Sequence, residues 1–149
     1  MAVDTETVKA HLASLNEYLN KIENQDLTLE VILGEEDVQE LLDRRMQLCL
    51  ENCIDIATHL AAGLNLPRRE TAASVFLLLG KHKIISRDLA ERMSGAAKFR
   101  NVLVHEYLDF DYRIAYEDLD EKLADLRQFA KEVVEFLEKE KKAKHKIYP

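Results

Sequence analysis

The chain has 149 residues, which is the usual size of one domain, so two separate domains are not expected. Hydrophobic residues make up 47% of the sequence and charged residues 33%, a composition that excludes a disordered chain and favours a packed core with a charged surface. Four Gly and two Pro are too few for a loop-rich β-sandwich or a glycine-cradled nucleotide fold. We therefore expect one domain over residues 1–149, built from helices.

Two N-terminal segments have apolar residues at alternating steps of three and four, a spacing typical of amphipathic helices. The first segment spans about residues 4–24 and the second about residues 35–62, with a break between them. Gly63, Asn65 and Pro67 follow the second segment, and each of these residue types is suited to ending a helix. The pattern predicts two long helices that pack through their apolar sides.

The middle of the chain predicts a short helix followed by a longer one. The apolar segment 71–79 is too hydrophobic to remain in water, and we expect Gly80 to end it. Ser86 is a good N-cap residue, and the helix that it opens should run to about His105 or Tyr107.

The last predicted helix repeats the same apolar spacing over residues 119–137 and then enters a basic tail, 139–149, which we expect to fray. Long amphipathic segments with short connections and no long alternating strand pattern predict an all-α, antiparallel helical bundle of about five helices.

Charge is distributed unevenly along the chain. The formal net charge is −7, which by itself argues against binding nucleic acid. Residues 67–105 nevertheless carry eight basic and three acidic side chains, a local net charge of +5, whereas the remainder has 13 basic and 25 acidic residues, or −12. A basic segment of this kind favours contact with an RNA backbone. The tail lysines could add phosphate contacts, although such a run is also typical of a solvated helix end.

Several common sites are absent from the sequence: there is no GxxxxGK[ST], no GxGxxG behind a strand, no HExxH and no pair of CxxC motifs. We therefore expect no cofactor and no metal ion. The segment MAVDTETVKA lacks the apolar region of a signal peptide, and no apolar stretch approaches the ~18 residues of a membrane helix. We expect a cytoplasmic protein without a membrane partner.

Cys49 and Cys53 are four residues apart and would face the same side of a helix, so they could supply two ligands to a zinc ion. His59 lies about 240° around the helix from Cys53 and does not join that face. Both cysteines fall on the apolar stripe of the second predicted helix, where a thiol behaves as a small hydrophobic group. We expect core packing, with metal ligation or a reactive thiol as alternatives.

The segment RNVLVHEY, residues 100–107, contains the residue types that phosphodiester chemistry needs without a metal ion. Arg100 can neutralise charge on phosphoryl oxygens, and His105 can take a proton from a ribose 2'-OH or give one to the leaving 5'-oxygen. On an ideal helix the two residues lie about 140° apart, whereas Arg100 and Tyr107 nearly eclipse. Either the helix distorts there or a second subunit completes the arrangement.

A structural reading of the same segment is also open. Arg and His side chains near a helix C-terminus oppose the helix dipole, and Tyr107 could anchor the helix end with its hydroxyl in water.

The segment RNVLVHEY fits the motif of the HepT-like proteins, a branch of the HEPN superfamily: an Arg, four residues, a His, any residue and a Tyr. The order of predicted helices resembles this family over most of residues 4–138, including CLENCIDIATHLAAGLNLP and ISRDLAERMSGAAKFRNVLVHEYLDFDY. The resemblance implies an all-α homodimer that acts as a metal-independent ribonuclease toxin, with motif residues of both subunits lining a cleft at the dimer interface.

Carried onto this sequence, the resemblance implies that Arg100 stabilises the phosphate and that His105 is the general acid or base. Asn101 matches the polar position after the Arg and would help to position RNA or the His. The antitoxin of the family is a minimal nucleotidyltransferase, which in characterised relatives attaches AMP to the motif tyrosine, here Tyr107. Two other functions remain open: a non-cleaving HEPN dimer that binds and regulates a nucleotidyltransferase, and a structural bundle with an incidental motif.

Overall fold

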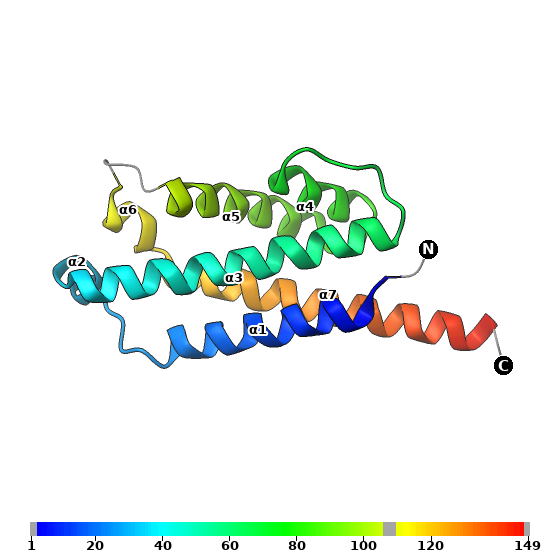
Figure 1. Cartoon of the computed structure of the whole chain (residues 1–149), viewed down its shortest axis with the longest axis horizontal. Coiled ribbons are helices and arrows are strands. Elements are labelled where there is room, and N and C mark those ends of the chain that lie inside the picture. The colour runs from blue at the N-terminus through cyan, green and yellow to red at the C-terminus, as the bar shows by residue number, and fades with distance from the viewer. Residues whose placement is uncertain (1–2, 106–109, 148–149) are drawn as a thin grey trace.

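The computed structural model describes residues 3–105 and 110–147 (Figure 1). Within these residues it contains seven helices: α1 (Thr5–Glu23), α2 (Leu29–Gly34), α3 (Glu36–Gly63), α4 (Ala72–Lys81), α5 (Arg87–His105), α6 (Tyr112–Tyr116) and α7 (Leu119–Ile147). The four long helices α1, α3, α5 and α7 lie alongside one another, and successive ones run in opposite directions (Figure 1). The predicted all-α antiparallel bundle is therefore confirmed.

The first two predicted helices are confirmed as α1 and α3, which pack closely against each other. Asp4 caps α1, because its side chain accepts a hydrogen bond from the backbone N–H of Thr7 at 3.1 Å. Asn65 follows α3 with a φ of 58°, a left-handed conformation that stops helical hydrogen bonding, as expected.

Two short helices, α2 and α6, lie in segments where the sequence predicted none. Thr28 caps α2 by accepting a hydrogen bond from the Val31 N–H, and Asp111 caps α6 by accepting from the N–H groups of Arg113 and Ile114. Each helix has six residues or fewer, which is too short for a helical period to show in the sequence. They contact each other at the end of the bundle where α5 ends (Figure 1).

Gly80 has a different role from the predicted one. It lies inside α4, which ends at Lys81, and it does not have a positive φ. A Cβ atom at Gly80 would lie 2.5 Å from the Cβ atom of Ala90, so glycine is required for the close packing of α4 against α5. The chain turns instead at Lys83, with a φ of 60°. The predicted short helix is thus confirmed as α4, with its end correct to within one residue, but Gly80 is required for packing and is not the stop signal.

The last predicted helix is confirmed as α7, which continues beyond residue 137 to Ile147. Its backbone is thus helical through most of the tail 139–149, and the fraying of that tail stays a prediction. The C-terminal turns of α7 extend beyond the other helices in Figure 1. Within the described residues, no helix is both long and apolar enough to cross a membrane.

Cys49 and Cys53 lie in the core between the long helices, with no solvent exposure, and both are free thiols. Burial raises the pKa of Cys49 to about 12 and raises that of Cys53 well above its usual value. The thiolate that metal ligation or nucleophilic attack requires is therefore disfavoured. The expectation of core packing is confirmed for both residues. No group of three or more His, Cys, Asp or Glu within residues 3–105 and 110–147 is placed to hold a metal ion.

Candidate active site at the C-terminal end of α5

Three of the four predicted site residues lie on the last part of α5, as one continuous helix. The helix begins after Ser86, whose hydroxyl accepts a hydrogen bond from the Leu89 N–H at 3.3 Å. Its inner side packs against α3, α4 and α7 through a spaced set of buried residues: Leu89, Ala90, Met93, Ser94, Ala97 and Leu103. This packing fixes the direction in which the site residues project. The fourth site residue, Tyr107, lies outside the described residues.

Arg100 is half-buried, and its Nε atom is fully buried without a hydrogen-bond acceptor in the part of the chain that the structure describes. It also makes no ion pair there. A guanidinium keeps its positive charge in proteins, and a buried donor without a partner costs about 1–3 kcal/mol. The helix dipole acts within the last turn of a helix, and Arg100 stands five residues before the end of α5, so it lies outside that turn. Dipole compensation therefore does not account for Arg100, whereas binding of an anion would satisfy it.

His105 is exposed and is the final residue of α5. Because it stands in the last turn, the helix dipole favours a positive charge at this position, and the structural reading stays open for His105. Asn101 is also exposed and lies about 40° from His105 around the helix, so the two share one face.

The helix does not distort between Arg100 and His105, because α5 is regular through both residues. Their side chains therefore leave the helix about 140° apart. Of the two ways to combine them that the sequence allowed, helix distortion is not observed.

A cluster of tyrosines around one carboxylate lies near this end of α5, and the sequence analysis did not identify it. The Asp43 carboxylate on α3 accepts hydrogen bonds from the hydroxyls of Tyr112 and Tyr116 on α6, at 2.6 and 2.5 Å. Burial, followed by the negative charge of Asp43, raises the pKa of Tyr116. The Phe99 ring packs edge-on against Tyr116 at 5.9 Å between centroids.

These contacts join α6 and the last turns of α5 to α3, and Phe99 directly precedes Arg100 in the chain. The only sign of this cluster in the sequence is the four-residue spacing of Tyr112 and Tyr116, which places them on one side of a helix. The surrounding segment has no helical pattern, so the spacing did not stand out. The carboxylate partner is 69 residues from Tyr112 in the sequence, so only the tertiary structure brings them together.

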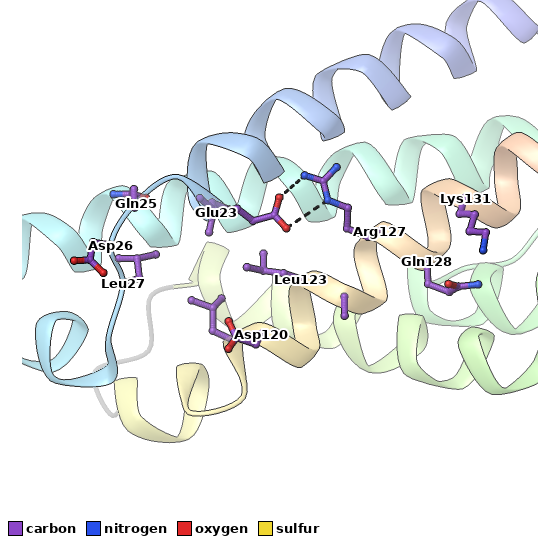
Figure 2. Close-up of a pocket in the computed structure, with 12 residues that line it drawn as sticks. Glu23, Gln25, Asp26, Leu27, Asp120, Leu123, Arg127, Gln128 and Lys131 are labelled. Atoms are coloured by element: carbon purple, nitrogen blue, oxygen red, sulfur yellow. Dashed lines mark hydrogen bonds and ion pairs between the residues drawn. The ribbon is translucent and has the colours of Figure 1, made fainter.

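A groove of about 630 Å³ lies elsewhere, between α1 and α7 (Figure 2). Arg127 on its wall donates hydrogen bonds to Asn16 at 2.6 Å, to Asn20 at 2.7 Å and to Glu23. Gln25 Oε1 is buried there without a donor among the described residues. The groove also holds carboxylates and a lysine, but the one arginine among its described lining residues is already paired within the chain, so it presents no guanidinium without an acceptor, in contrast to Arg100.

The sequence matches the model of the family described as "Ribonuclease HepT-like" over residues 15–133, most of the chain. One relative is a tRNA nuclease HepT of Aphanizomenon flos-aquae, which is 30% identical over 105 residues, or 70% of this chain and 71% of the relative. Another is an mRNA nuclease HepT of Shewanella oneidensis, which is 28% identical over 92 residues, or 62% of this chain and 69% of the relative.

Solved structures show the same fold at low sequence identity. A tri-AMPylated Shewanella oneidensis HEPN toxin, solved in complex with an MNT antitoxin, superposes with a TM-score of 0.79 and 22% identity, covering 85% of this chain and 96% of that one. YutE of Bacillus subtilis, a cytosolic protein of unknown function, superposes with a TM-score of 0.81 and 19% identity, covering 94% and 95%. The family match spans the candidate site at Arg100, Asn101 and His105. The chain belongs to the ribonuclease HepT-like family.

Proposed function

We propose that this HepT-like ribonuclease is the toxin of a HEPN/nucleotidyltransferase toxin–antitoxin module. It cuts RNA without a metal ion, at a site formed by two subunits of a homodimer. The observation that carries the proposal is Arg100, a permanent positive charge with a buried Nε that has no acceptor within the described residues. The Arg100 side chain as a whole is only half-buried, and an RNA phosphate supplies the charge opposite to that of its guanidinium.

The reaction is an internal transesterification, in which the phosphorus changes its bond from the 5'-oxygen to the neighbouring 2'-oxygen. His105 takes the proton of a ribose 2'-OH, and the oxygen attacks the adjacent phosphorus. The bond from phosphorus to the 5'-oxygen breaks, and a protonated imidazole, the second copy of His105, gives that oxygen its proton. The products are a 2',3'-cyclic phosphate and a 5'-OH end, and no water is consumed. Arg100 stabilises the charge that develops on the phosphoryl oxygens. Asn101, on the same face of α5 as His105, positions the RNA or the imidazole.

The angle between the two site residues supports the proposed dimer. Since Arg100 and His105 leave a regular helix about 140° apart, one subunit does not direct both at a single phosphate. A second α5 at the interface brings a second Arg and His to the site. Light scattering at micromolar concentration should give the mass of a dimer, and a monomer would contradict the shared site.

The proposed antitoxin is a nucleotidyltransferase that transfers AMP to Tyr107. The relative described as tri-AMPylated in complex with its antitoxin supports this part of the proposal. An attached nucleotide carries negative charge that repels an RNA phosphate and obstructs access to His105. Mass spectrometry after co-expression should find AMP on the peptide that contains Tyr107, and an unmodified peptide would contradict the assignment. Tyr107→Phe should remain toxic when the antitoxin is present.

A second function, a non-cleaving dimer that holds and regulates a nucleotidyltransferase, is favoured by the complexes in which similar toxins occur with antitoxins. It predicts a stable complex with no loss of RNA. The two functions differ in RNA cleavage, so an activity measurement separates them.

The decisive experiment compares growth after induction of the wild type, Arg100→Ala and His105→Ala, with total RNA from the same cells resolved for fragments. Growth arrest with fragments, both lost in the two variants, is the expected result. Normal growth and intact RNA with a folded wild-type protein would favour the non-cleaving dimer.

A further inference from the structure

A groove of about 520 Å³ lies between the start of α5 and α7, at the end of α5 opposite to His105. Seven charged residues line it: Lys81, Lys83, Arg87, Lys131, Lys139, Glu132 and Glu135. Its walls therefore carry a net charge of +3, although the whole chain has a net charge of −7. We call this feature the basic groove.

The cations of the basic groove are not neutralised by the protein. Elsewhere in the bundle Arg92 pairs with Asp88 and Asp125, and Lys122 pairs with Asp118. None of the five groove cations has a carboxylate within 4.0 Å among the residues that the structure describes. Like charges gathered without counter-ions repel one another, and a polyanion relieves that repulsion.

Of the two carboxylates that line the groove, Glu132 is already engaged. It accepts hydrogen bonds from the Ser86 N–H at 2.7 Å and from Gln128 Nε2 at 2.8 Å. This carboxylate therefore caps the N-terminus of α5 from α7, and the positive side chains around it remain available to an external anion.

Exposed side chains on one side of α5 lead from the basic groove toward the candidate active site, and the small residue Ser94, about 20° from the line through them, is buried between them. Eighteen residues are five helical turns, so Arg87 and His105 lie on the same side of α5, about 27 Å apart along the axis. Lys98 lies between them, about 20° from the same line, and all three side chains are exposed. Glu91 is an exposed acidic residue about 40° from this line.

We propose that the basic groove is a second RNA-binding site, which holds the backbone of the substrate several nucleotides away from the bond that is cut. The inference rests on the proposed ribonuclease function and adds to it a surface that binds RNA through phosphates, without reading bases. Lys98 continues the contact along α5 toward His105.

Binding is measured with a fluorescent single-stranded RNA over a series of salt concentrations, in a His105→Ala background that prevents cleavage. The test variant is Lys81→Ala/Lys131→Ala. The control, Lys9→Ala/Lys21→Ala, makes the same charge change at exposed lysines of α1. Loss of two phosphate contacts should weaken binding and reduce the slope of log K against log salt by about 1.4. The control should match the parent protein, with circular dichroism confirming the fold of both variants.

Cleavage by the two double variants with His105 intact provides an independent readout. The groove variant should raise KM and leave kcat unchanged, because the lysines are far from the reacting phosphate. Glu91→Gln should act in the opposite direction and tighten RNA binding, a gain that a purely structural role of these residues does not produce.

Wild-type protein that cuts RNA, with a groove variant that binds RNA like the control, would overturn the second site and leave the ribonuclease function intact. A groove variant that binds RNA normally but no longer binds the nucleotidyltransferase would overturn the second RNA-binding site and assign the groove to a protein partner. If the wild type binds RNA without cutting it, and the groove variant reduces that binding, the second site stands and the proposed ribonuclease function fails.

Discussion

Two half-buried arginines of this bundle have opposite surroundings. Arg127, in the groove between α1 and α7, donates hydrogen bonds to Glu23 (Figure 2) and also to Asn16 and Asn20, so its guanidinium is paired within the chain. Arg100, near the end of α5, has a buried Nε with no acceptor among the described residues. The first arginine joins two helices of the fold, whereas the Nε of the second has no acceptor within the described residues. The groove at Arg127 and the candidate site at Arg100 are therefore different places.

The largest effect should come from His105→Ala, because it removes the group that moves the proton. Cleavage of RNA should fall by roughly 10²- to 10⁴-fold, measured as initial rates with purified protein. His82→Ala is the matched control, since His82 is another exposed histidine at the end of a helix and should be replaced without loss of rate. Undiminished cleavage by a folded His105→Ala protein would exclude its catalytic role.

Arg100→Ala should reduce the cleavage rate by roughly 10²- to 10³-fold, the effect of losing one group that stabilises transition-state charge. Because Arg100 makes no hydrogen bond within the described chain, the melting temperature should stay the same or rise. Arg100→Lys keeps the charge without the guanidinium fork, so its cleavage rate should lie between the rates of the wild type and Arg100→Ala. A large fall in melting temperature with an unchanged rate would assign Arg100 to the fold.

Arg127→Ala should show the reverse pattern. Loss of its contacts to α1 should lower the free energy of unfolding by about 1–2 kcal/mol, a value reduced from that of buried charged hydrogen bonds because Arg127 is partly exposed. Urea unfolding measures the change, and RNA cleavage should be retained at temperatures where the variant is folded. A loss of cleavage without loss of stability would remove the contrast between the two arginines.

Tyr116→Phe should have the smallest effect, about 0.5–1.5 kcal/mol of unfolding free energy. It removes one hydroxyl donor from Asp43 but leaves the donor of Tyr112 and the buried ring in place. The same urea measurement applies, with Tyr18→Phe as a control, since Tyr18 lies on α1, away from this cluster. Equal stability of Tyr116→Phe and wild type would show that the hydrogen bond contributes nothing net.

Much of the fold could be predicted because long amphipathic helices repeat their apolar residues over many turns. The ranges predicted for α1, α3 and α5 agree with the structure within a few residues, whereas α7 begins where predicted but continues past residue 137 to Ile147. The burial of Cys49 and Cys53 followed from their place on the stripe. The helices α2 and α6 escaped prediction because they depend on single caps and on contact with each other. Gly80 was misread because its close partner, Ala90, lies on another helix.

The sequence by itself determined the class of the fold, the family motif and the residue types at the candidate site, because periodicity and short motifs are local properties. Only the tertiary structure decided which charges are paired. Arg100 and Arg127 look alike in the sequence, and their difference arises from side chains that packing brings together, such as Glu23, which is 104 residues from Arg127. Hydrogen bonding and burial depend on neighbours in space, so they follow from the packed bundle and not from the order of residues.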